Sequence, residues 1–233
     1  MKVVILCGGK GTRLSEETIT IPKPMVKIGD KPIIWHLMKI FSYFGFDEFI
    51  LATGYKKEVI ENFFTDNQDF KKIETIDTGQ ETLTGGRLLR LKEKLSEEKT
   101  FLMTYGDGLC DINIQNLVDF HKNHKKIATL TAVHPPVRFG ELKLQEDKIV
   151  DFQEKPQANA GWVNGGFFVL NNEILNYIDN DQTIFEREPM TKLSKSGELM
   201  AYKHEKFWQC MDTMRDKILL NKMWNNKKAP WKK

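Results

Sequence analysis

Three glycines and an arginine stand close together near the start of the chain, in Gly8-Gly9-Lys10-Gly11-Thr12-Arg13. Glycine lets a backbone approach a phosphate closely, and successive N–H groups in such a turn form an anion-binding concavity. The planar guanidinium of Arg13 suits two phosphate oxygens. The segment lacks the third glycine of a dinucleotide-binding fingerprint and the closing Gly-Lys-Ser/Thr of a P-loop. It therefore predicts a phosphate-binding loop of another kind, with a flexible surface turn as the alternative.

One lysine and two aspartates have settings that suit the handling of phosphate charge. Lys23 lies between two prolines, which stiffen its loop and limit where the ammonium can point. Asp107 stands between two glycines, and Asp212 precedes a predicted helix. Mg²⁺ takes one or two carboxylates beside phosphates and keeps several waters. We therefore expect Asp107 and Asp212 to bind Mg²⁺, and the alternatives are a turn residue for Asp107 and a helix N-cap for Asp212.

A phosphate acceptor would need no general base. A phosphomonoester has its second pKa at about 6, so its oxygen is already a nucleophile at neutral pH. No histidine of the chain stands in a pattern typical of catalysis or metal binding, which agrees with this chemistry.

The elements that must position these residues begin with a strand. Val3 to Cys7 is a continuous apolar run that ends at Gly8, typical of a central strand covered on both faces. Apolar residues at three- and four-residue spacing predict a helix over 32–44. Further strands are predicted at 49–53, 73–76 and 100–105, and further helices at 57–64, 86–95 and 114–122. This alternation predicts an α/β fold, a doubly wound, mostly parallel, Rossmann-like sheet that binds ligands at the carboxyl ends of its strands.

The second half of the chain has a mixed pattern. Strands are predicted at 141–145, 149–154 and 162–170, and helices at 173–178, 190–196 and 216–224. We expect antiparallel additions to the sheet here. The whole chain, 1–233, is predicted to be one domain, with a nucleotide-binding half over 1–133 and an acceptor-binding half over 134–233.

Composition points to a small-molecule partner. The 233 residues carry 35 basic and 32 acidic side chains, a net charge of +3, and 40% are hydrophobic. This near balance argues against nucleic acid as a partner. No signal peptide or membrane span is apparent, so we expect a cytoplasmic protein without membrane partners. Three scattered cysteines predict neither disulfides nor a zinc ribbon.

Several further segments carry a resemblance to a known family. Leu6 to Leu14, followed by Pro22-Lys23-Pro24-Met25, resembles the signature of the sugar-phosphate nucleotidyltransferases. Five further segments narrow the resemblance to one group within this family. They are Thr84-Gly85-Gly86-Arg87, Tyr105-Gly106-Asp107-Gly108, Glu154-Lys155-Pro156, Asn164-Gly165-Gly166-Phe167-Phe168 and Phe207-Trp208-Gln209-Cys210-Met211-Asp212-Thr213. In order and spacing, the chain is most similar to the glucose-1-phosphate cytidylyltransferases, over essentially its whole length.

The resemblance implies an enzyme that transfers CMP from CTP to the phosphate of a small acceptor and releases pyrophosphate. It implies catalytic roles for Arg13, Lys23 and Lys155, and Mg²⁺ at Asp107 and Asp212. The implied nucleotide-binding residues are Leu6, Gly8, Gly9, Gly11, Thr12, Thr84, Gly85, Gly86, Arg87 and Gly106. Among them, Thr84-Gly85-Gly86-Arg87 is expected to bind the base, because its glycines could expose backbone N–H and C=O groups to a pyrimidine edge; the alternative is a turn before a helix. The implied acceptor-binding residues are Glu154, Trp162, Asn164 and Gly165.

The chain departs from this family between the second predicted helix and Asp77-Thr78-Gly79, where it is much shorter. The acceptor and the assembly into a possible homo-oligomer are therefore open. A shortened relative is the CTP:phosphoglutamine cytidylyltransferase of capsule polysaccharide modification, and phosphoglutamine is the acceptor ranked first. Glucose 1-phosphate is the alternative. A nucleotide-sensing module without turnover is a competing function.

Overall fold

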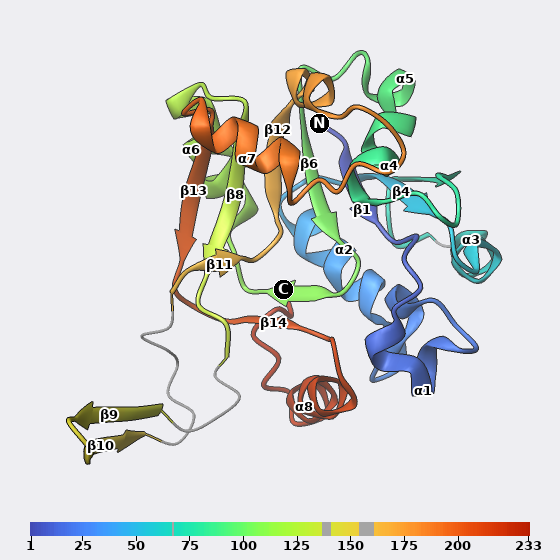
Figure 1. Cartoon of the computed structure of the whole chain (residues 1–233). Helices are drawn as coiled ribbons and strands as arrows, with labels where there is room; N and C mark the ends of the chain where they lie inside the picture. Colours follow the sequence, from blue (N-terminus) through green and yellow to red (C-terminus); the bar gives the residue numbers. More distant parts are fainter. Residues whose placement is uncertain (67, 137–140, 154–160) are drawn as a thin grey trace.

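A computed structural model describes residues 1–66, 68–136, 141–153 and 161–233 (Figure 1). Its centre is an eight-stranded sheet in the order β11-β8-β12-β6-β1-β4-β5, with β13 paired to β8. The bounds of these strands are β1 Val3–Leu6, β4 Glu48–Thr53, β5 Lys72–Asp77, β6 Thr100–Tyr105, β8 Ala128–Val133, β11 Val163–Asn164, β12 Phe168–Asn171 and β13 Leu199–His204.

Strand β1 lies inside the parallel part of this sheet. Val3 is in register with Phe49 of β4 on one side and Leu102 of β6 on the other. Strands β4 and β5 are also parallel, as are β8 and β13, whereas β12 runs antiparallel to β6 and β8. The predicted α/β class, mostly parallel with antiparallel additions in the second half, is confirmed.

Helices cover both faces of the sheet because β1 is apolar on both. Val3 and Ile5 belong to one hydrophobic cluster, and Val4 and Leu6 belong to the other. The first cluster contains side chains of α2 (Ile33–Tyr43), α3 (Lys57–Phe64), α6 (Ile114–His124) and α8 (Met214–Asn225). The second contains side chains of α4 (Thr84–Arg90), α5 (Lys92–Leu95), the 3₁₀ helix η3 (Asn172–Tyr177) and α7 (Glu188–Lys195).

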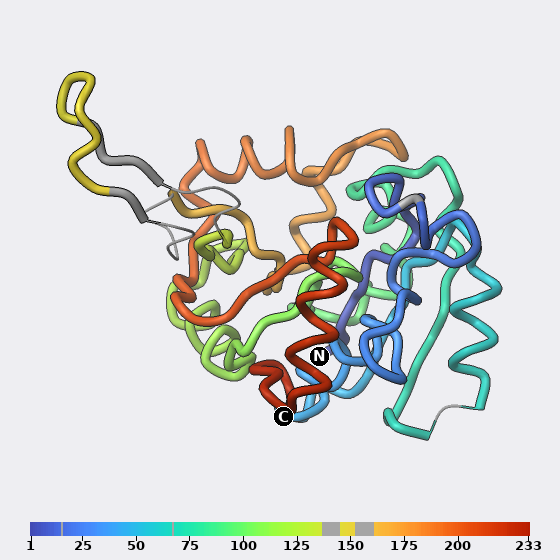
Figure 2. The backbone as a smooth tube through the Cα atoms, turned by 90° about the horizontal axis from the view of Figure 1, so that it is seen from below, coloured from blue at the N-terminus to red at the C-terminus, as the bar shows by residue number. Residues whose placement is uncertain are grey.

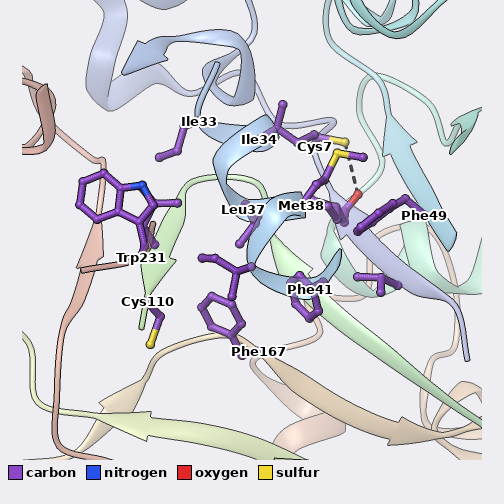
Figure 3. Packing of buried hydrophobic residues seen from close by; sticks show 14 of the residues in the cluster. Cys7, Ile33, Ile34, Leu37, Met38, Phe41, Phe49, Cys110, Phe167 and Trp231 are labelled. Atoms are coloured by element: carbon purple, nitrogen blue, oxygen red, sulfur yellow. Dashed lines mark hydrogen bonds between the residues drawn. The ribbon is translucent and has the colours of Figure 1, made fainter. Parts of the chain in front are cut away.

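Helix α2 provides much of the first cluster. Ile33, Leu37 and Phe41 point from successive turns into the core, and Phe41 stacks on Phe167 with 5.7 Å between ring centroids (Figure 3). Trp231, six residues beyond α8, lies in the same core. The end of the described chain is therefore anchored against the first helix of the wound sheet.

Three small antiparallel pairs complete the fold. They are β2 (Lys27–Ile28) with β3 (Lys31–Pro32), β7 (Gly108–Cys110) with β14 (Trp208–Cys210), and β9 (Glu141–Gln145) with β10 (Lys148–Gln153). Short helices η1 (Thr12–Leu14), α1 (Ser15–Thr18) and η2 (Lys23–Met25) follow β1. The β9–β10 hairpin stands apart from the sheet in both views (Figures 1 and 2).

Three predicted elements differ in detail. The helix expected at 86–95 begins at Thr84 and is divided into α4 and α5 at Leu91. The strand expected at 162–170 is two strands, because Gly166 (φ +75°) and Phe167 (φ +49°) have positive φ values that interrupt an extended chain. The helix expected at 173–178 is 3₁₀ rather than α.

All three cysteines are free. Among the described residues, no helix combines the length and the apolar character that crossing a membrane requires.

Candidate active site

A cleft of about 580 Å³ opens at the carboxyl ends of β1 and β6. This is the edge at which an α/β sheet is expected to bind ligands. Its lining comes from both halves of the chain. The predicted site residues among the lining are Leu6, Gly8, Gly9, Gly11, Arg13, Lys23, Thr84, Arg87, Gly106, Asp107, Asn164, Gly165 and Asp212.

The glycine loop follows β1 directly and needs its glycines for different reasons. A Cβ on Gly9 would have no neighbour within 4 Å, so its backbone faces open space. Gly11 has φ +64°, and a Cβ there would lie 2.9 Å from Cβ of Lys23. A Cβ on Gly8 would lie 2.0 Å from Nη1 of Arg87. The loop is thus open toward the cleft and closely packed beneath. Thr12 is placed in η1 and is not among the cleft-lining residues.

Lys23 connects the two predicted metal-binding aspartates. Its Nζ lies 2.5 Å from Oδ2 of Asp107 and 2.6 Å from Oδ1 of Asp212, and its side chain is 9% exposed. Burial acts to lower the pKa of Lys23, but the charge of Asp107 and the hydrogen bonds to both carboxylates outweigh it and raise the pKa above its ordinary value. The ammonium is therefore charged at neutral pH.

Asp212 also contacts Arg13, whose Nη1 lies 2.7 Å from Oδ2. Burial would raise the pKa of Asp212, but the hydrogen bond and charge of Lys23, with a contribution from Arg13, lower it below the ordinary value. The side chain of Arg13 is 74% exposed, so it can reach a ligand in the cleft. The two cations and two carboxylates form one connected cluster.

The β7–β14 pair brings these aspartates together across the sequence. Gly108 is in register with Cys210, and the N–H of Met211 donates to the carbonyl of Asp107 over 2.9 Å. The alternative role of Asp212 as a helix N-cap is wrong, because Thr213 caps α8. In that capping box, the Asp216 carboxylate also accepts from the N–H groups of Asp212 and Thr213. The carboxylate of Asp212 remains directed at Lys23 and Arg13.

Cys210 belongs to the same cluster and was not predicted from the sequence. Its Sγ and carboxylate oxygens of Asp107 and Asp212 lie within 4.8 Å of one another. Burial raises the pKa of the Cys210 thiol, and Asp107 raises it further, so the thiol stays protonated. The other donors of this cluster are the carboxylate oxygens of the two aspartates. Hard carboxylate oxygens in one cleft with the glycine loop fit Mg²⁺, and these two residues would hold it.

Residues 84–87, which were expected to form a base-binding turn, begin a helix that packs against another part of the chain. The N–H of Gly85 donates to the carbonyl of Thr183 over 2.9 Å, and a Cβ on Gly86 would lie 2.4 Å from the carbonyl oxygen of Asp181. These glycines allow close packing against residues 181–183, so their N–H groups are not exposed to a base edge as expected. Thr84 does line the cleft, and its hydroxyl donates to Oε2 of Glu186 over 2.6 Å.

Of the predicted acceptor-binding residues, Asn164 and Gly165 lie in the cleft. The amide of Asn164 donates to the hydroxyl of Tyr105 over 3.3 Å, and the carbonyl of Gly165 accepts from the indole of Trp208 over 2.8 Å. Trp162 is not among the cleft-lining residues. Its ring packs against His134, with centroids 3.9 Å apart. Glu154 and Lys155 lie outside the described residues.

Glu186 and Tyr105 are further cleft residues for which the sequence analysis predicted no role. The hydroxyl of Tyr105 donates to Oε1 of Glu186 over 2.6 Å, so this carboxylate is held by two hydroxyl groups. Tyr105 could have been found because it adjoins Gly106-Asp107, whereas Glu186 had no signal in its own neighbourhood.

The fold and cleft together define a phosphate-handling transferase built on a wound α/β sheet. A family model described as "Nucleotidyl transferase" matches residues 2–218. The chain belongs to this family and is a nucleotidyltransferase, which confirms the predicted enzyme class.

Relatives that match over nearly their full length support this assignment. Glucose-1-phosphate cytidylyltransferase of Salmonella typhi is 49% identical over 254 aligned positions, which cover 100% of this chain and 99% of that protein. The probable glucose-1-phosphate cytidylyltransferase of Bacillus subtilis is 43% identical, with the same coverage. The alignments are longer than the 233 residues of this chain, so both relatives carry residues that it lacks.

Solved structures share the fold. HddC from Yersinia pseudotuberculosis, also solved in a complex with GMP-PN, is 26% identical with a TM-score of 0.77, and the match covers 96% of this chain and 99% of that one. A UDP-glucose pyrophosphorylase matches with a TM-score of 0.75 at 18% identity, covering 97% of this chain and 98% of that one.

Proposed function

We propose that this protein is a cytidylyltransferase that moves CMP from CTP to the phosphate of a small acceptor, glucose 1-phosphate, with release of pyrophosphate. One observation carries the proposal: Lys23 lies between Asp107 and Asp212 beside an open glycine loop, in a cleft at the carboxyl edge of the sheet. The names of the similar bacterial proteins favour CTP and glucose 1-phosphate.

The reaction joins two anions, so the chain must bring positive charge to both. A phosphate oxygen of the acceptor forms a bond to the α-phosphorus of CTP, and the bond from that phosphorus to the bridging oxygen breaks as pyrophosphate leaves with the electron pair. The glycine loop and the exposed guanidinium of Arg13 would bind the triphosphate. The ammonium of Lys23 would pair with the α-phosphate, where charge is shared between attacking and leaving oxygens.

Mg²⁺ bound by Asp107 and Asp212 would neutralise part of the triphosphate charge. No residue is required to remove a proton from the acceptor, because its phosphate is already largely ionised. Asp212, in the proposed acceptor-binding half, pairs with Lys23 in the proposed nucleotide-binding half, so residues of both would act at the same phosphates. Lys155 and Glu154 remain predicted contacts to the acceptor.

Phosphoglutamine is the second candidate acceptor. The observation in its favour is that this chain is shorter than the glucose-1-phosphate cytidylyltransferases before Asp77-Thr78-Gly79. A different acceptor would explain why that segment is missing. The two similar cytidylyltransferases instead favour glucose 1-phosphate, so the order of the two acceptors is reversed from that reached on sequence alone.

Pyrophosphate release tests the proposal directly. The protein is mixed with Mg²⁺, one of CTP, UTP or GTP, and either glucose 1-phosphate or phosphoglutamine. We expect pyrophosphate and CDP-glucose from CTP with glucose 1-phosphate, at a rate at least about tenfold above the other pairs. Pyrophosphate release from CTP with phosphoglutamine but not with glucose 1-phosphate would show that phosphoglutamine is the acceptor. CTP binding without pyrophosphate from any acceptor would instead support the nucleotide-sensing module.

A further inference from the structure

Arg87 is a buried arginine beneath the glycine loop. The residue is 4% exposed, and its guanidinium donates four hydrogen bonds. Nη2 donates to the carbonyl of Gly8 over 3.0 Å. Nη1 donates to the carbonyls of Thr53 (3.0 Å) and Gly79 (2.8 Å) and to the hydroxyl of Thr78 (2.8 Å). The side chain therefore reaches three separate segments from α4.

These three segments follow neighbouring parallel strands. Gly8 comes after β1, Thr53 ends β4, and Gly79 comes after β5. The Gly8 carbonyl also accepts from the N–H of Tyr55 over 3.1 Å, and the Thr53 carbonyl accepts from the N–H of Thr78 over 2.9 Å, so Arg87 adds a second donor to each. Carbonyl oxygens carry partial negative charge, which would repel a bound phosphate. One guanidinium donates to all three carbonyls at the edge where the cleft opens.

Among the described residues, no carboxylate forms an ion pair with this guanidinium. Its four hydrogen-bond acceptors are three carbonyl oxygens and one hydroxyl, all uncharged. The charge of Asp77 acts on it, but that carboxylate forms its ion pair with Lys57, at 2.8 Å. A buried charge without a counter-ion is costly, so a structure that keeps one has a use for it. An anion bound to the loop above would supply the missing negative charge.

We propose that Arg87 is a positioning residue for the triphosphate: it fixes the Gly8 carbonyl beneath the loop and places an uncompensated positive charge under the phosphates. The inference deepens the proposed function and rests on it. It also replaces the sequence-based expectation that Arg87 contacts the base. A base contact would act on every cytosine compound alike, whereas a charge beneath the loop acts on phosphates.

The test compares ligands that differ only in their phosphates. Binding of CTP, CMP and cytidine is measured by calorimetry for the unmodified protein, for Arg87→Met and for Arg87→Lys. We expect Arg87→Met to weaken CTP binding by at least about tenfold, CMP less, and cytidine by no more than about twofold. Arg87→Lys keeps the charge and should fall between the unmodified protein and Arg87→Met for CTP. Equal losses for all three ligands, or no loss for CTP, would overturn the proposal.

Arg90→Met is the matched control. Arg90 lies one turn further along α4, is exposed, and pairs with Asp181 outside the cleft lining. The same change of charge there should leave CTP binding within about twofold, because exposed pairs are strongly screened. A loss as large as that of Arg87→Met would show that net charge alone is responsible and would overturn the proposal.

A second variant keeps the test decisive if Arg87→Met does not fold. Thr78→Val keeps the shape but removes a hydroxyl that accepts from Nη1 of Arg87 and donates to the carbonyl of Thr53, and Thr78 does not line the cleft. We expect a CTP loss of at least about twofold with unchanged cytidine binding. Unchanged CTP binding would overturn the proposal. If the enzyme uses another triphosphate, the same series with UTP, UMP and uridine separates this inference from the choice of base.

Discussion

At the scale of single residues, the transfer centre depends on charges that compensate one another. Lys23 is surrounded by Asp107, Asp212 and a protonated Cys210, and Arg13 holds Asp212 from the solvent side. Lys23 and Arg13, which would bind phosphate in the proposed function, are thus both already held by carboxylates. The arrangement fixes the ammonium before any ligand arrives, which lowers the cost of ordering it.

Asp107→Asn should abolish turnover and leave the fold intact. The amide keeps the shape of the carboxylate but removes its charge and most of its affinity for Mg²⁺. We expect pyrophosphate release to fall by at least about a hundredfold, with the free energy of unfolding changed by no more than about 1 kcal/mol.

The measurement is pyrophosphate release at saturating Mg²⁺, with urea unfolding in parallel. Asp66→Asn, an exposed aspartate after α3, is the matched control and should behave as the unmodified protein. Normal turnover of Asp107→Asn would show that Asp107 is not a ligand of Mg²⁺.

The Asp212–Lys23 pair should make stability depend on acid pH. The folded pKa of Asp212 is lowered from 3.8, so the pair stabilises the fold above the unfolded pKa and loses this effect as pH falls through the folded value. The free energy of unfolding should therefore drop as the solution is acidified below about pH 4.

Urea unfolding of the unmodified protein and Asp212→Asn at several pH values checks this. The difference between the two should shrink toward low pH, because the unmodified carboxyl becomes neutral there. A difference in the free energy of unfolding that stays constant from pH 7 to the lowest pH measured would show that the Asp212–Lys23 pair does not stabilise the fold.

At the scale of elements, the N-terminus of α8 sets the position of Asp212. Thr213 and Asp216 form a capping box, and the same Asp216 carboxylate holds the N–H of Asp212. Asp212 therefore depends on a helix cap, although it is not the cap itself.

Thr213→Ala should affect both stability and turnover. Loss of an N-cap hydroxyl costs about 1 kcal/mol. Looser placement of Asp212 should reduce turnover by roughly two- to tenfold. Thermal unfolding and pyrophosphate release measure the two effects, and Thr213→Ser, which keeps the hydroxyl, should restore both. Reduced stability with fully normal turnover would show that the cap does not position Asp212.

Local sequence signals predicted the elements well where periodicity or a continuous apolar run was strong. The helix at 32–44 and the strand at 100–105 are observed as α2 (Ile33–Tyr43) and β6 (Thr100–Tyr105). The interruption between β11 and β12 was not predicted: Gly165-Gly166 was a signal for it that the continuous strand ignored, whereas the positive φ of Phe167 has no sequence signal. The start of α4 was missed because its contact partner, residues 181–183, lies almost a hundred positions away.

At the scale of the whole molecule, one cleft joins segments from the first loop, the centre and the end of the chain. The sequence predicted most of its cationic and anionic residues through the resemblance. It could not predict that Lys23 bridges the two aspartates or that Arg87 is buried under Gly8, since both depend on contacts between distant segments. Glu186 was missed for the same reason.

Binding of CTP should therefore stabilise the entire fold. A ligand at about a hundred times its Kd stabilises by about 2.7 kcal/mol, which corresponds to roughly 5–10 °C in the unfolding midpoint for a chain of this size. Thermal scans with CTP and Mg²⁺ should show one transition that shifts by this amount, and the same concentration of cytidine should shift it less. Two separate transitions, only one of which moves, would show that the halves unfold independently.

The pairing of β7 with β14 has a consequence for the order of folding. Asp107 and Asp212 are 105 positions apart in the sequence, and this pair brings them to the same ammonium of Lys23. Contacts of such long range form slowly compared with local ones. A fragment of the protein that stops before β14 would therefore leave Lys23 with one of its two carboxylate neighbours.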